Sequence, residues 1–240
     1  MTLKIVSWNI WGGQYLTEII KTLREADADV IGLQEVIQDT DGKNNIAKAI
    51  AEELGYNFVF VPNYKVETSR LFKELESKTV EIGNSILSKR KINSFGMHQI
   101  SDDKKRTVIE AQVTFGKKAV HLFSAHLVHT HQQESADQNQ QARNLLELIP
   151  AENSILMADV NATPNTDCLK ILSGILIDSD PEALAPTWSV YQEGCIVCSS
   201  QKIDTRLDYI FTSKDLKSKS FKVFDSKGSD HLPILAEIQI

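Results

Sequence analysis

Residues 228–233 read GSDHLP and lead directly into an apolar run, ILAEIQI, over residues 234–240. Asp and Ser favour turns because their side chains bond nearby backbone, and Pro fixes the backbone angle φ. Taken alone, the stretch therefore predicts a turn before a strand, with His231 at the surface. An acid and an imidazole side by side have a chemical role only if the chain supplies partners for them elsewhere.

The overall composition is that of a globular protein long enough for one large domain. The chain has 240 residues, of which 42% are hydrophobic and 24% are charged, and both values are ordinary for a soluble protein. No repeat, low-complexity segment or linker divides the sequence, so we predict a single domain over residues 1–240. The formal net charge of -6 argues against a protein that coats nucleic acid through a basic face, but not against an enzyme that meets phosphate groups locally.

The sequence shows neither a targeting signal nor a membrane span. The segment TLKIVSWNI at residues 2–10 is strand-like and lacks a basic region followed by an apolar one. No apolar run approaches the roughly 18 residues that a bilayer requires. We therefore expect a soluble, cytoplasmic protein without a membrane span, and we expect a monomer.

The three cysteines give a weak signal. Cys195 and Cys198 form a C-x-x-C, which would suit a redox pair or half of a zinc site, and Cys168 stands apart. No second C-x-x-C and no H-x-x-x-H accompanies this pair in the sequence. We therefore predict free thiols in a loop.

Hydrophobic patterning predicts strands and helices in two halves. In the first half we expect strands at 3–10, 28–36 and 56–61, helices at 16–26 and 46–54, and a long loop or irregular helix over the charged residues 63–80. In the second half we expect a polar helix at 132–149 and strands at 82–88, 94–100, 106–115, 118–125, 153–160, 205–213, 219–225 and 232–240. This pattern predicts an α/β fold in which two packed mixed β-sheets are flanked by helices.

Polar side chains recur where these predicted strands end. They are Asn9, Glu35, His126, Asp159 with Asn161, Asp208, and Asp230 with His231. Proteins of the α/β class place ligand sites where buried strands emerge. A single polar residue at a strand end is unremarkable, but six independent cases indicate a site.

The chemistry of these residues is coherent. Oxygen donors such as Glu35 and Asp230 suit a hard cation such as Mg²⁺, which would neutralise the charge of a phosphate. Asp159 and Asn161 alternate in the sequence DVN, so both side chains point to one face if the stretch is extended. A carboxylate there accepts a proton from water, and the amide fixes its position.

An acid beside His231 would orient the ring and favour its charged form, which stabilises a phosphoryl oxygen. Asp208 is the better candidate for this pairing, because it leaves Asp230 free for a metal ion.

In this combination the sequence resembles the endonuclease/exonuclease/phosphatase superfamily of divalent-metal phosphoesterases, to which pancreatic deoxyribonuclease is related. The matching motifs, in the order of the family, are SWNI (7–10), LQEV (33–36), GNSILS (83–88), SAHL (124–127), ADVN (158–161), LDYIF (207–211) and SDHLP (229–233). Each motif alone is weak, whereas the ordered set is specific and covers almost the whole chain. The resemblance implies a four-layer α/β/β/α sandwich and makes the opening turn part of a catalytic site.

The resemblance also implies roles for the matching residues. Glu35 would be the principal metal ligand, for Mg²⁺ or Mn²⁺, with Asp230 approaching the metal and Asn9 supporting the network of metal and phosphate. Asp159 would position or deprotonate the attacking water, with Asn161 assisting.

On the phosphate side, His231 would contact the scissile group, oriented by Asp208, and His126 matches the phosphate-contacting histidine of many members. We assign substrate binding to Asn9, Asn84, Arg106 and Trp188. For Trp188 in the motif PTW, packing in the core and a place in a groove wall both remain open.

Departures from the family pattern leave the substrate open. Apurinic-site endonucleases usually have Tyr where this chain has His126, and inositol polyphosphate 5-phosphatases have a W-C-D-R-I-like motif where this chain has RLDYIF. Where the family pattern more commonly has Gly-Asp, this chain has Ala-Asp at residues 158–159. The match is to the superfamily core, and DNA, RNA, a phosphoinositide, a sphingolipid or a small phosphate ester are all substrate candidates.

Two other function classes compete with a magnesium phosphoesterase. A non-catalytic binding module on the same fold would lack a Glu, Asp or His among the motifs, and none is missing. A zinc hydrolase is suggested by His129 and His131, but Gln132 and Gln133 follow where an H-x-H-x-D-H motif needs Asp and His. We therefore interpret these two histidines as loop residues near the mouth of the substrate site, and His98 and His121 as ordinary strand residues.

Overall fold

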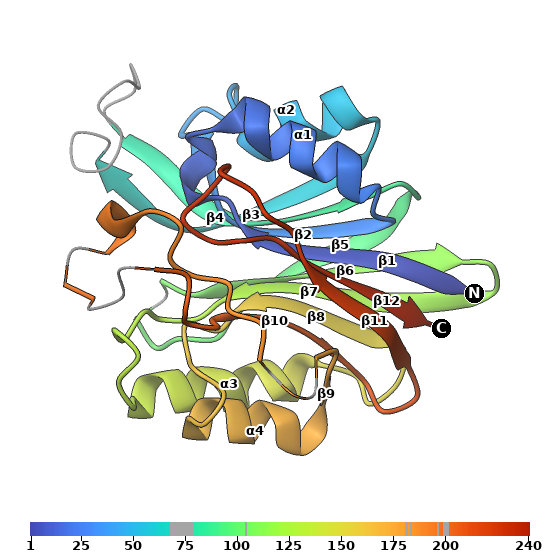
Figure 1. Ribbon diagram of the computed structural model, residues 1–240. Coiled ribbons are helices and arrows are strands. Elements are labelled where there is room, and N and C mark those ends of the chain that lie inside the picture. The colour runs from blue at the N-terminus through green and yellow to red at the C-terminus, as the bar shows by residue number, and fades with distance from the viewer. Residues whose placement is uncertain (68–78, 104, 181, 183, 196, 199–201) are drawn as a thin grey trace.

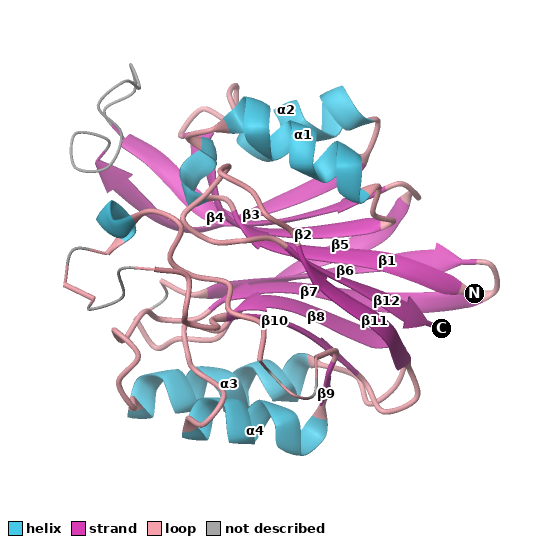
Figure 2. Ribbon diagram, viewed as in Figure 1, coloured by secondary structure: helices cyan, strands magenta, loops and turns pink. Residues whose placement is uncertain are grey.

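Two six-stranded sheets pack face to face, and a pair of helices covers the outer face of each sheet (Figures 1 and 2). The computed structural model describes residues 1–67, 79–103, 105–180, 182, 184–195, 197–198 and 202–240. The predicted four-layer α/β/β/α arrangement is confirmed. None of the helices within these residues is long and apolar enough to cross a membrane.

The first sheet has the strand order β11-β12-β1-β2-β4-β3. Its strands are β1 (Thr2–Asn9), β2 (Val30–Asp39), β3 (Asn57–Glu67), β4 (Thr79–Ser88), β11 (Lys217–Val223) and β12 (Ile234–Gln239). β1 and β2 run parallel, and the other neighbouring pairs are antiparallel. The sheet is therefore mixed, as predicted.

The second sheet repeats this plan with the order β5-β6-β7-β8-β10-β9. Its strands are β5 (Ile92–Gln99), β6 (Thr107–Phe115), β7 (Lys118–His126), β8 (Ser154–Asp159), β9 (Ile177–Asp178) and β10 (Asp208–Thr212). Here β7 and β8 form the parallel pair. Each sheet thus has a central parallel pair whose carboxyl ends can carry site residues.

Within the part of the chain that the structure describes, four α-helices form the outer layers. On the first sheet lie α1 (Leu16–Ala26) and α2 (Ile46–Leu54), and on the second lie α3 (Ala136–Leu148) and α4 (Asp167–Ile175). The side chains of Asn45, Ser135 and Thr166 accept hydrogen bonds from backbone N–H groups in the first turns of α2, α3 and α4. These caps satisfy donors that a helix cannot satisfy internally, and so they fix where the helices begin.

The central core lies between the sheets and is built from alternating apolar side chains. Ile5, Ile86, Ile109, Leu122 and Ile210 are all fully buried there. Separate apolar clusters lie between each sheet and its helices. Because both faces of the central strands are covered, those strands appear in the sequence as continuous apolar runs.

The structure corrects the prediction at both ends of the predicted loop 63–80 and in the stretch that contains α4 and β9. Residues 63–67 belong to β3 and not to a loop, because Tyr64 and Val66 pack against a cluster of Ile37, Val80 and Ile82. Residues 79–80 of the same predicted loop belong to β4, and residues 68–78 lie outside the described residues. The helix α4 was missed, although its buried Cys168, Leu169 and Leu172 have helical spacing.

Candidate active site

Three polar side chains lie in a row at one edge of the second sheet. His126 pairs with Asp159 across the parallel strands β7 and β8, and Asp159 pairs with Asp208 across β8 and β10. Residues opposite one another on neighbouring strands project from the same face of the sheet. The register of three strands therefore brings together residues that are far apart in the sequence.

Glu35 reaches the same edge from the first sheet through a β-bulge. The register between β2 and β4 shifts between Leu33 and Val36. Two residues of β2, Gln34 and Glu35, therefore lie opposite a single residue of β4, Asn84. Glu35 has φ 54°, a left-handed conformation that costs a non-glycine residue roughly 1–3 kcal/mol and is typical of functional sites. A bulge re-aims a side chain in this way, here toward the second sheet.

Asp159 is fully buried and held by two donors. Asn9 Nδ2 donates to its Oδ2 at 2.9 Å, and the backbone N–H of Asn161 donates to its Oδ1 at 2.9 Å. Burial raises the pKa of Asp159 to about 7; the charge of His231 opposes this shift, and the charge of Asp208 adds to it. The carboxylate is thus positioned by bonds from both sheets and can exchange a proton near neutral pH.

His231 lies between two carboxylates. Its Nδ1 is 2.9 Å from Asp208 Oδ2, and its Nε2 is 3.8 Å from Asp159 Oδ2. Burial by itself lowers the pKa of His231, but the charges of Asp208, Asp159 and Asp230 outweigh this effect and hold the pKa well above its ordinary range. The ring is therefore an imidazolium at neutral pH.

The turn that carries His231 is fastened to β1 and does not lie free at the surface. Ser229 Oγ donates to the carbonyl oxygen of Asn9 at 2.7 Å, and the indole N–H of Trp8 donates to the carbonyl oxygen of His231 at 2.8 Å. His231 is 5% exposed. The opening turn is thus a rigid part of the site, because buried hydrogen bonds fix both its ends.

Asn161 connects the row of acids to two histidines. Its Nδ2 is 3.1 Å from the carbonyl oxygen of Leu127 and 2.9 Å from His126 Nε2, and its Oδ1 is 2.8 Å from His129 Nδ1. A backbone carbonyl can only accept a hydrogen bond, so the Asn161 atom beside the Leu127 oxygen must be the donor nitrogen Nδ2. The same nitrogen then also donates to His126 Nε2. His126 is accordingly neutral, since burial and then the charge of Arg106 lower its pKa well below the ordinary range.

Glu35 and Asp230 form an acidic side of the site that fits a hard divalent cation. Burial, and then the charge of Asp230, raise the pKa of Glu35. Trp188 Nε1 donates to Asp230 Oδ2 at 3.3 Å. Asn9 Oδ1 accepts from the backbone N–H of Trp11 at 3.0 Å, and this oxygen keeps a second lone pair. Oxygen donors that repel one another match the ligand preference of Mg²⁺ or Mn²⁺.

These side chains line one cavity of about 270 Å³. Its walls include Glu35, Arg106, His126, Asp159, Asn161, Trp188, Asp230 and His231, together with Tyr64, His129, His131, Gly194 and Cys195. Asn9 and Asp208 lie behind this wall as the buried partners of Asp159 and His231. Two carboxylates that could hold a cation, a buried carboxylate and an imidazolium therefore face one small volume.

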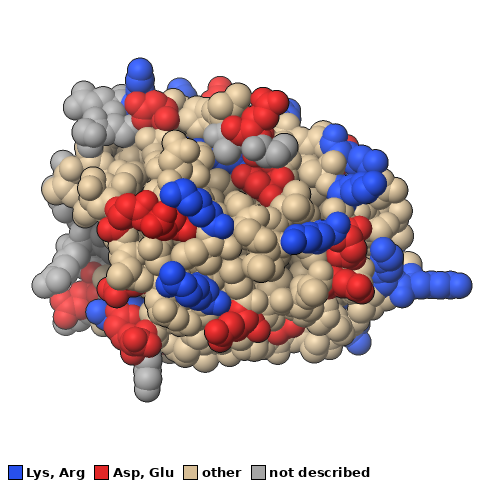
Figure 3. Space-filling model, turned by 90° about the horizontal axis from the view of Figure 1, so that it is seen from below, with Lys and Arg blue, Asp and Glu red and all other residues tan. Residues whose placement is uncertain are grey.

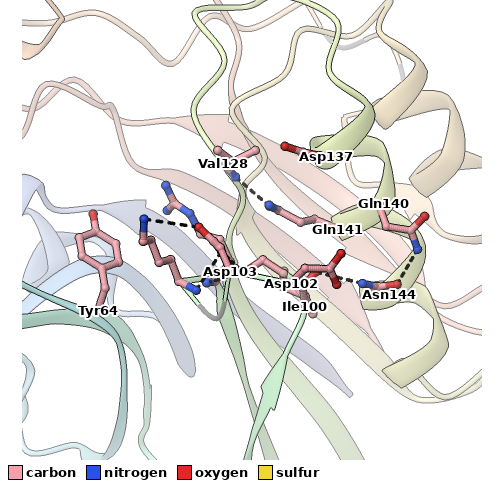
Figure 4. A pocket seen from close by; sticks show the side chains of 12 residues that line it. Tyr64, Ile100, Asp102, Asp103, Val128, Asp137, Gln140, Gln141 and Asn144 are labelled. Carbon is pink, nitrogen blue, oxygen red and sulfur yellow. Dashed lines mark hydrogen bonds and ion pairs between the residues drawn. The ribbon is translucent and has the colours of Figure 1, made fainter.

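A second cavity of about 440 Å³ adjoins the first through Tyr64 and Arg106. In Figure 4, Tyr64 stands on one side of this cavity and the α3 residues Gln140 and Asn144 on the other. The guanidinium of Arg106 lies 5.8 Å from the centre of the Tyr64 ring, a cation–π distance. This cavity offers room for the part of a ligand that extends away from the first.

The sequence matches the model of the Endonuclease/Exonuclease/phosphatase family over residues 6–231. The chain belongs to this family. Its members are hydrolases that act on phosphoester bonds with divalent metal ions, and they include nucleases and phosphatases. No curated protein matches the sequence significantly.

Three solved structures share the fold over at least 99% of their own length. An endonuclease/exonuclease/phosphatase family protein from Leptotrichia buccalis has a TM-score of 0.76 and 20% identity, with 99% of this chain and 100% of that chain covered. A mannosyl-6-phosphatase from Bacteroides thetaiotaomicron has a TM-score of 0.73 and 19% identity, with 99% of this chain and 100% of that chain covered. TDP2 from D. rerio, complexed with single-stranded DNA product, has a TM-score of 0.69 and 16% identity, with 100% of this chain and 99% of that chain covered.

Of the four residues that we assigned to substrate binding, Arg106 and Trp188 border the smaller cavity, whereas Asn84 does not. Asn84 is fully buried, and its Nδ2 donates to the carbonyl oxygen of Thr107 at 2.8 Å, so it joins the two sheets and does not line either cavity. Trp188 is 3% exposed and serves both expected purposes, because it packs in the interior and also borders the smaller cavity. Tyr64 was missed, since it belongs to no motif and lies in a segment predicted as a loop.

The prediction of free thiols is wrong for Cys195 and Cys198, because the structure joins them as a disulfide. Cys168 is a free cysteine that is buried in α4. His98 and His121 are strand residues that both contact the Glu110 carboxylate, at 3.0 Å each. His129 and His131 lie in the loop after β7, at the cavity, and they contact the cysteine pair.

Proposed function

We propose that the protein is a Mg²⁺-dependent phosphoesterase, also active with Mn²⁺, that hydrolyses a phosphodiester or phosphomonoester by in-line attack of water. The position of His231 between Asp208 and Asp159, in the same cavity as Glu35 and Asp230, carries this proposal. A cation held by Glu35 and Asp230, with Asn9 beside them, would neutralise charge on the phosphate and on the leaving oxygen.

Asp159 is the residue we assign to the attacking water. The donors Asn9 and Asn161 hold its carboxylate in one orientation. A pKa of about 7 suits a general base that must accept a proton from water and release it again at neutral pH. Asn161, fixed by its bonds to Leu127 and His129, would orient the same water.

His231 is the residue we assign to the phosphate. Its Nδ1 is engaged by Asp208, whereas the Nε2–H is too far from Asp159 for a hydrogen bond and is free to donate. A fixed imidazolium stabilises negative charge that develops on a phosphoryl oxygen during attack. His126 has the opposite character, because its Nε2 accepts from Asn161; we therefore assign it to positioning Asn161, in place of the phosphate contact that the family resemblance implied.

The remainder of the substrate has room in the adjoining cavity of about 440 Å³. Arg106 borders both cavities and would bind a second phosphate or the polar part of the leaving group. On the face viewed in Figure 3, the side of α3 and α4, the described basic and acidic side chains are interspersed, so this face does not favour a broad clamp for duplex DNA. Among the structural neighbours one is a sugar phosphatase and another binds single-stranded DNA, so a small phosphate ester and a nucleic-acid end both fit this proposal.

Three further expectations belong to the proposal. A single domain over residues 1–240 is supported by the site itself, which combines residues from Asn9 to His231. We also propose that the protein acts as a monomer and that it works in the cytoplasm.

A substrate panel tests the proposal. The purified protein with Mg²⁺ is incubated with DNA, RNA, phosphoinositides, sphingomyelin and sugar phosphates, and the released phosphate or alcohol is measured. We expect hydrolysis of at least one class and its loss in EDTA. Binding without hydrolysis across the panel would favour the alternative, a catalytically inactive phosphate- or nucleic-acid-binding module.

A further inference from the structure

Two loops meet beside the active-site cavity and bring together two histidines and two cysteines. His129 and His131 lie in the loop between β7 and α3, while Cys195 and Cys198 follow the short 3-10 helix η3 (Gln192–Gly194). Their ligand atoms all lie within 4.8 Å of one another. We propose that these four residues bind one zinc ion when the cysteines are reduced, as a structural site separate from the catalytic cation.

The four distances between a sulfur and a ring nitrogen match the S–N edges of a tetrahedral zinc site, and the sulfur–sulfur edge forms only when the disulfide is cleaved. Zn–S and Zn–N bonds of about 2.3 and 2.1 Å give S–N edges of about 3.6 Å in a tetrahedron. Cys198 Sγ is 3.4 Å from His131 Nδ1 and 3.6 Å from His129 Nε2, and Cys195 Sγ is 3.5 and 3.9 Å from the same two atoms. The two ring nitrogens are 3.0 Å apart, against about 3.4 Å for an N–N edge.

The hydrogen bonds of His129 prepare it to bind a metal ion. Because Asn161 Oδ1 accepts at 2.8 Å, the proton of His129 is on Nδ1 and its Nε2 carries a lone pair. That lone pair faces His131 and both cysteines. Histidines that bind metals characteristically donate their other N–H to an oxygen in this way, which fixes the ring.

The disulfide is the oxidised alternative to the zinc site. A thiol reductant supplies the two electrons that cleave the Cys195–Cys198 bond, and the reductant itself becomes a disulfide. The two thiols then lose their protons as zinc binds both sulfurs, so that each zinc ion bound releases two protons. Oxidation and zinc binding therefore exclude each other.

The donor set separates this site from the catalytic one. Thiolate and imidazole ligands favour Zn²⁺, whereas the carboxylates of Glu35 and Asp230 favour Mg²⁺ or Mn²⁺. Four protein ligands leave no open position for water, so the zinc would hold structure and not hydrolyse the substrate. No single sequence motif holds all four ligands, because the fold divides them between two loops.

Zinc at this position would stabilise two contacts of the active site. His129 holds Asn161 Oδ1. Gly194, the neighbour of Cys195, lies so close to Asp230 that a Cβ atom on it would overlap the carboxylate. Joining the loops thus fixes the surroundings of one residue that we assign to the water and of one that we assign to the cation.

Metal analysis of the purified chain tests the inference. The protein is reduced with a thiol, incubated with Zn²⁺ and passed over a desalting column, and zinc and protein are then quantified. We expect one zinc ion per chain in the wild type and in Cys168→Ser, the matched cysteine control, and none in Cys198→Ser. His131→Ala provides a second variant at an exposed position, and it too should lose the metal.

Cobalt provides a signature of the ligands, and Glu35→Gln separates the two sites. Co²⁺ in place of zinc should show the visible and sulfur-to-cobalt charge-transfer bands of a tetrahedral dithiolate site, and these bands should persist in Glu35→Gln even if that variant loses hydrolysis. Zinc retained in Cys198→Ser and His131→Ala, zinc lost in Glu35→Gln, or no zinc on the reduced wild type would each overturn the inference, whatever the substrate of the enzyme is.

Discussion

His231 Nδ1 lies 2.9 Å from Asp208 Oδ2, and Nε2 of the same ring is directed toward Asp159 Oδ2 at 3.8 Å. The ring is 5% exposed and Asp208 is fully buried, so little solvent screens the interaction. One carboxylate thus fixes the ring, and the other faces the nitrogen that is free to donate. The expected behaviour of the enzyme follows from this arrangement.

His231→Ala should reduce kcat much more than it changes KM, because the ring acts mainly on charge that develops in the transition state. Losing such a partner commonly costs on the order of 10²–10³ in rate. Asp208→Asn should cost part of this effect, and the double variant should be little worse than His231→Ala alone, since the two act as a unit. Steady-state kinetics of the four proteins decide this, and strictly multiplicative losses would show that the residues work independently.

The pH dependence of kcat should have two limbs. Activity should rise as Asp159 loses its proton, with a pKa of about 7 before the cation binds, and fall only where His231 loses its proton, well above the ordinary range of histidine. Because the charge of Asp208 raises the pKa of His231, Asp208→Asn should move the alkaline limb to lower pH. An alkaline limb unchanged in Asp208→Asn would contradict the assignment of that limb to His231.

Glu35→Gln should remove the stabilisation that Mg²⁺ gives the wild type. A cation that binds only the folded protein at about 100 times its Kd adds about 2.7 kcal/mol to the free energy of unfolding. Thermal unfolding with and without Mg²⁺ should show a rise in Tm for the wild type and little or none for the variant. An equal rise in both would place the cation elsewhere.

Without a metal ion, Glu35→Gln should change the stability of the fold in the opposite direction. The folded-state pKa of Glu35 is raised by burial and by Asp230. The protonated carboxyl group therefore contributes fully to the stability of the fold below the unfolded-state pKa, and this contribution is lost as the pH rises through the folded-state pKa. Above that pH the ionised carboxylate destabilises the metal-free fold. Glu35→Gln should therefore unfold at a higher Tm than the wild type in EDTA at alkaline pH, and a lower Tm there would contradict the account.

Arg106→Ala should raise KM for substrates with a large or charged leaving group, with a smaller effect on kcat. Arg106 borders both cavities, and losing a charge-assisted contact to a ligand costs about 1.5–3 kcal/mol, or roughly 10–150-fold in affinity. Arg143→Ala, at an exposed position on α3, is the matched control. Equal KM changes in the two variants would indicate a general effect of surface charge.

The sequence predicted the parts of the site that local chemistry determines. The pairing of Asp208 with His231 is predicted because it leaves Asp230 free for a metal ion, and the contact between the two side chains is present. Asp159 and His126 could be placed at one edge because each ends an apolar run, and neighbouring strands align their ends.

Other features depend on pairings that no local pattern encodes. The extension of β3 to Glu67 depends on its partner β4, since Tyr64 gains a buried neighbour only after pairing. The meeting of His131 with Cys198 joins residues 67 positions apart through two irregular loops. The bulge at Glu35 likewise appears only in the register between β2 and β4.

The most direct test of the account is the initial rate of phosphoester hydrolysis with Mg²⁺ for the wild type, Asp159→Asn and the exposed control Asp41→Asn. Bis(4-nitrophenyl) phosphate and 4-nitrophenyl phosphate report diester and monoester cleavage by colour. We predict hydrolysis of at least one by the wild type and by Asp41→Asn, and a loss on the order of 10²–10⁴ in Asp159→Asn, because a positioned general base contributes about that factor. Hydrolysis by Asp159→Asn at the rate of the wild type would contradict the central claim that water is activated at this site.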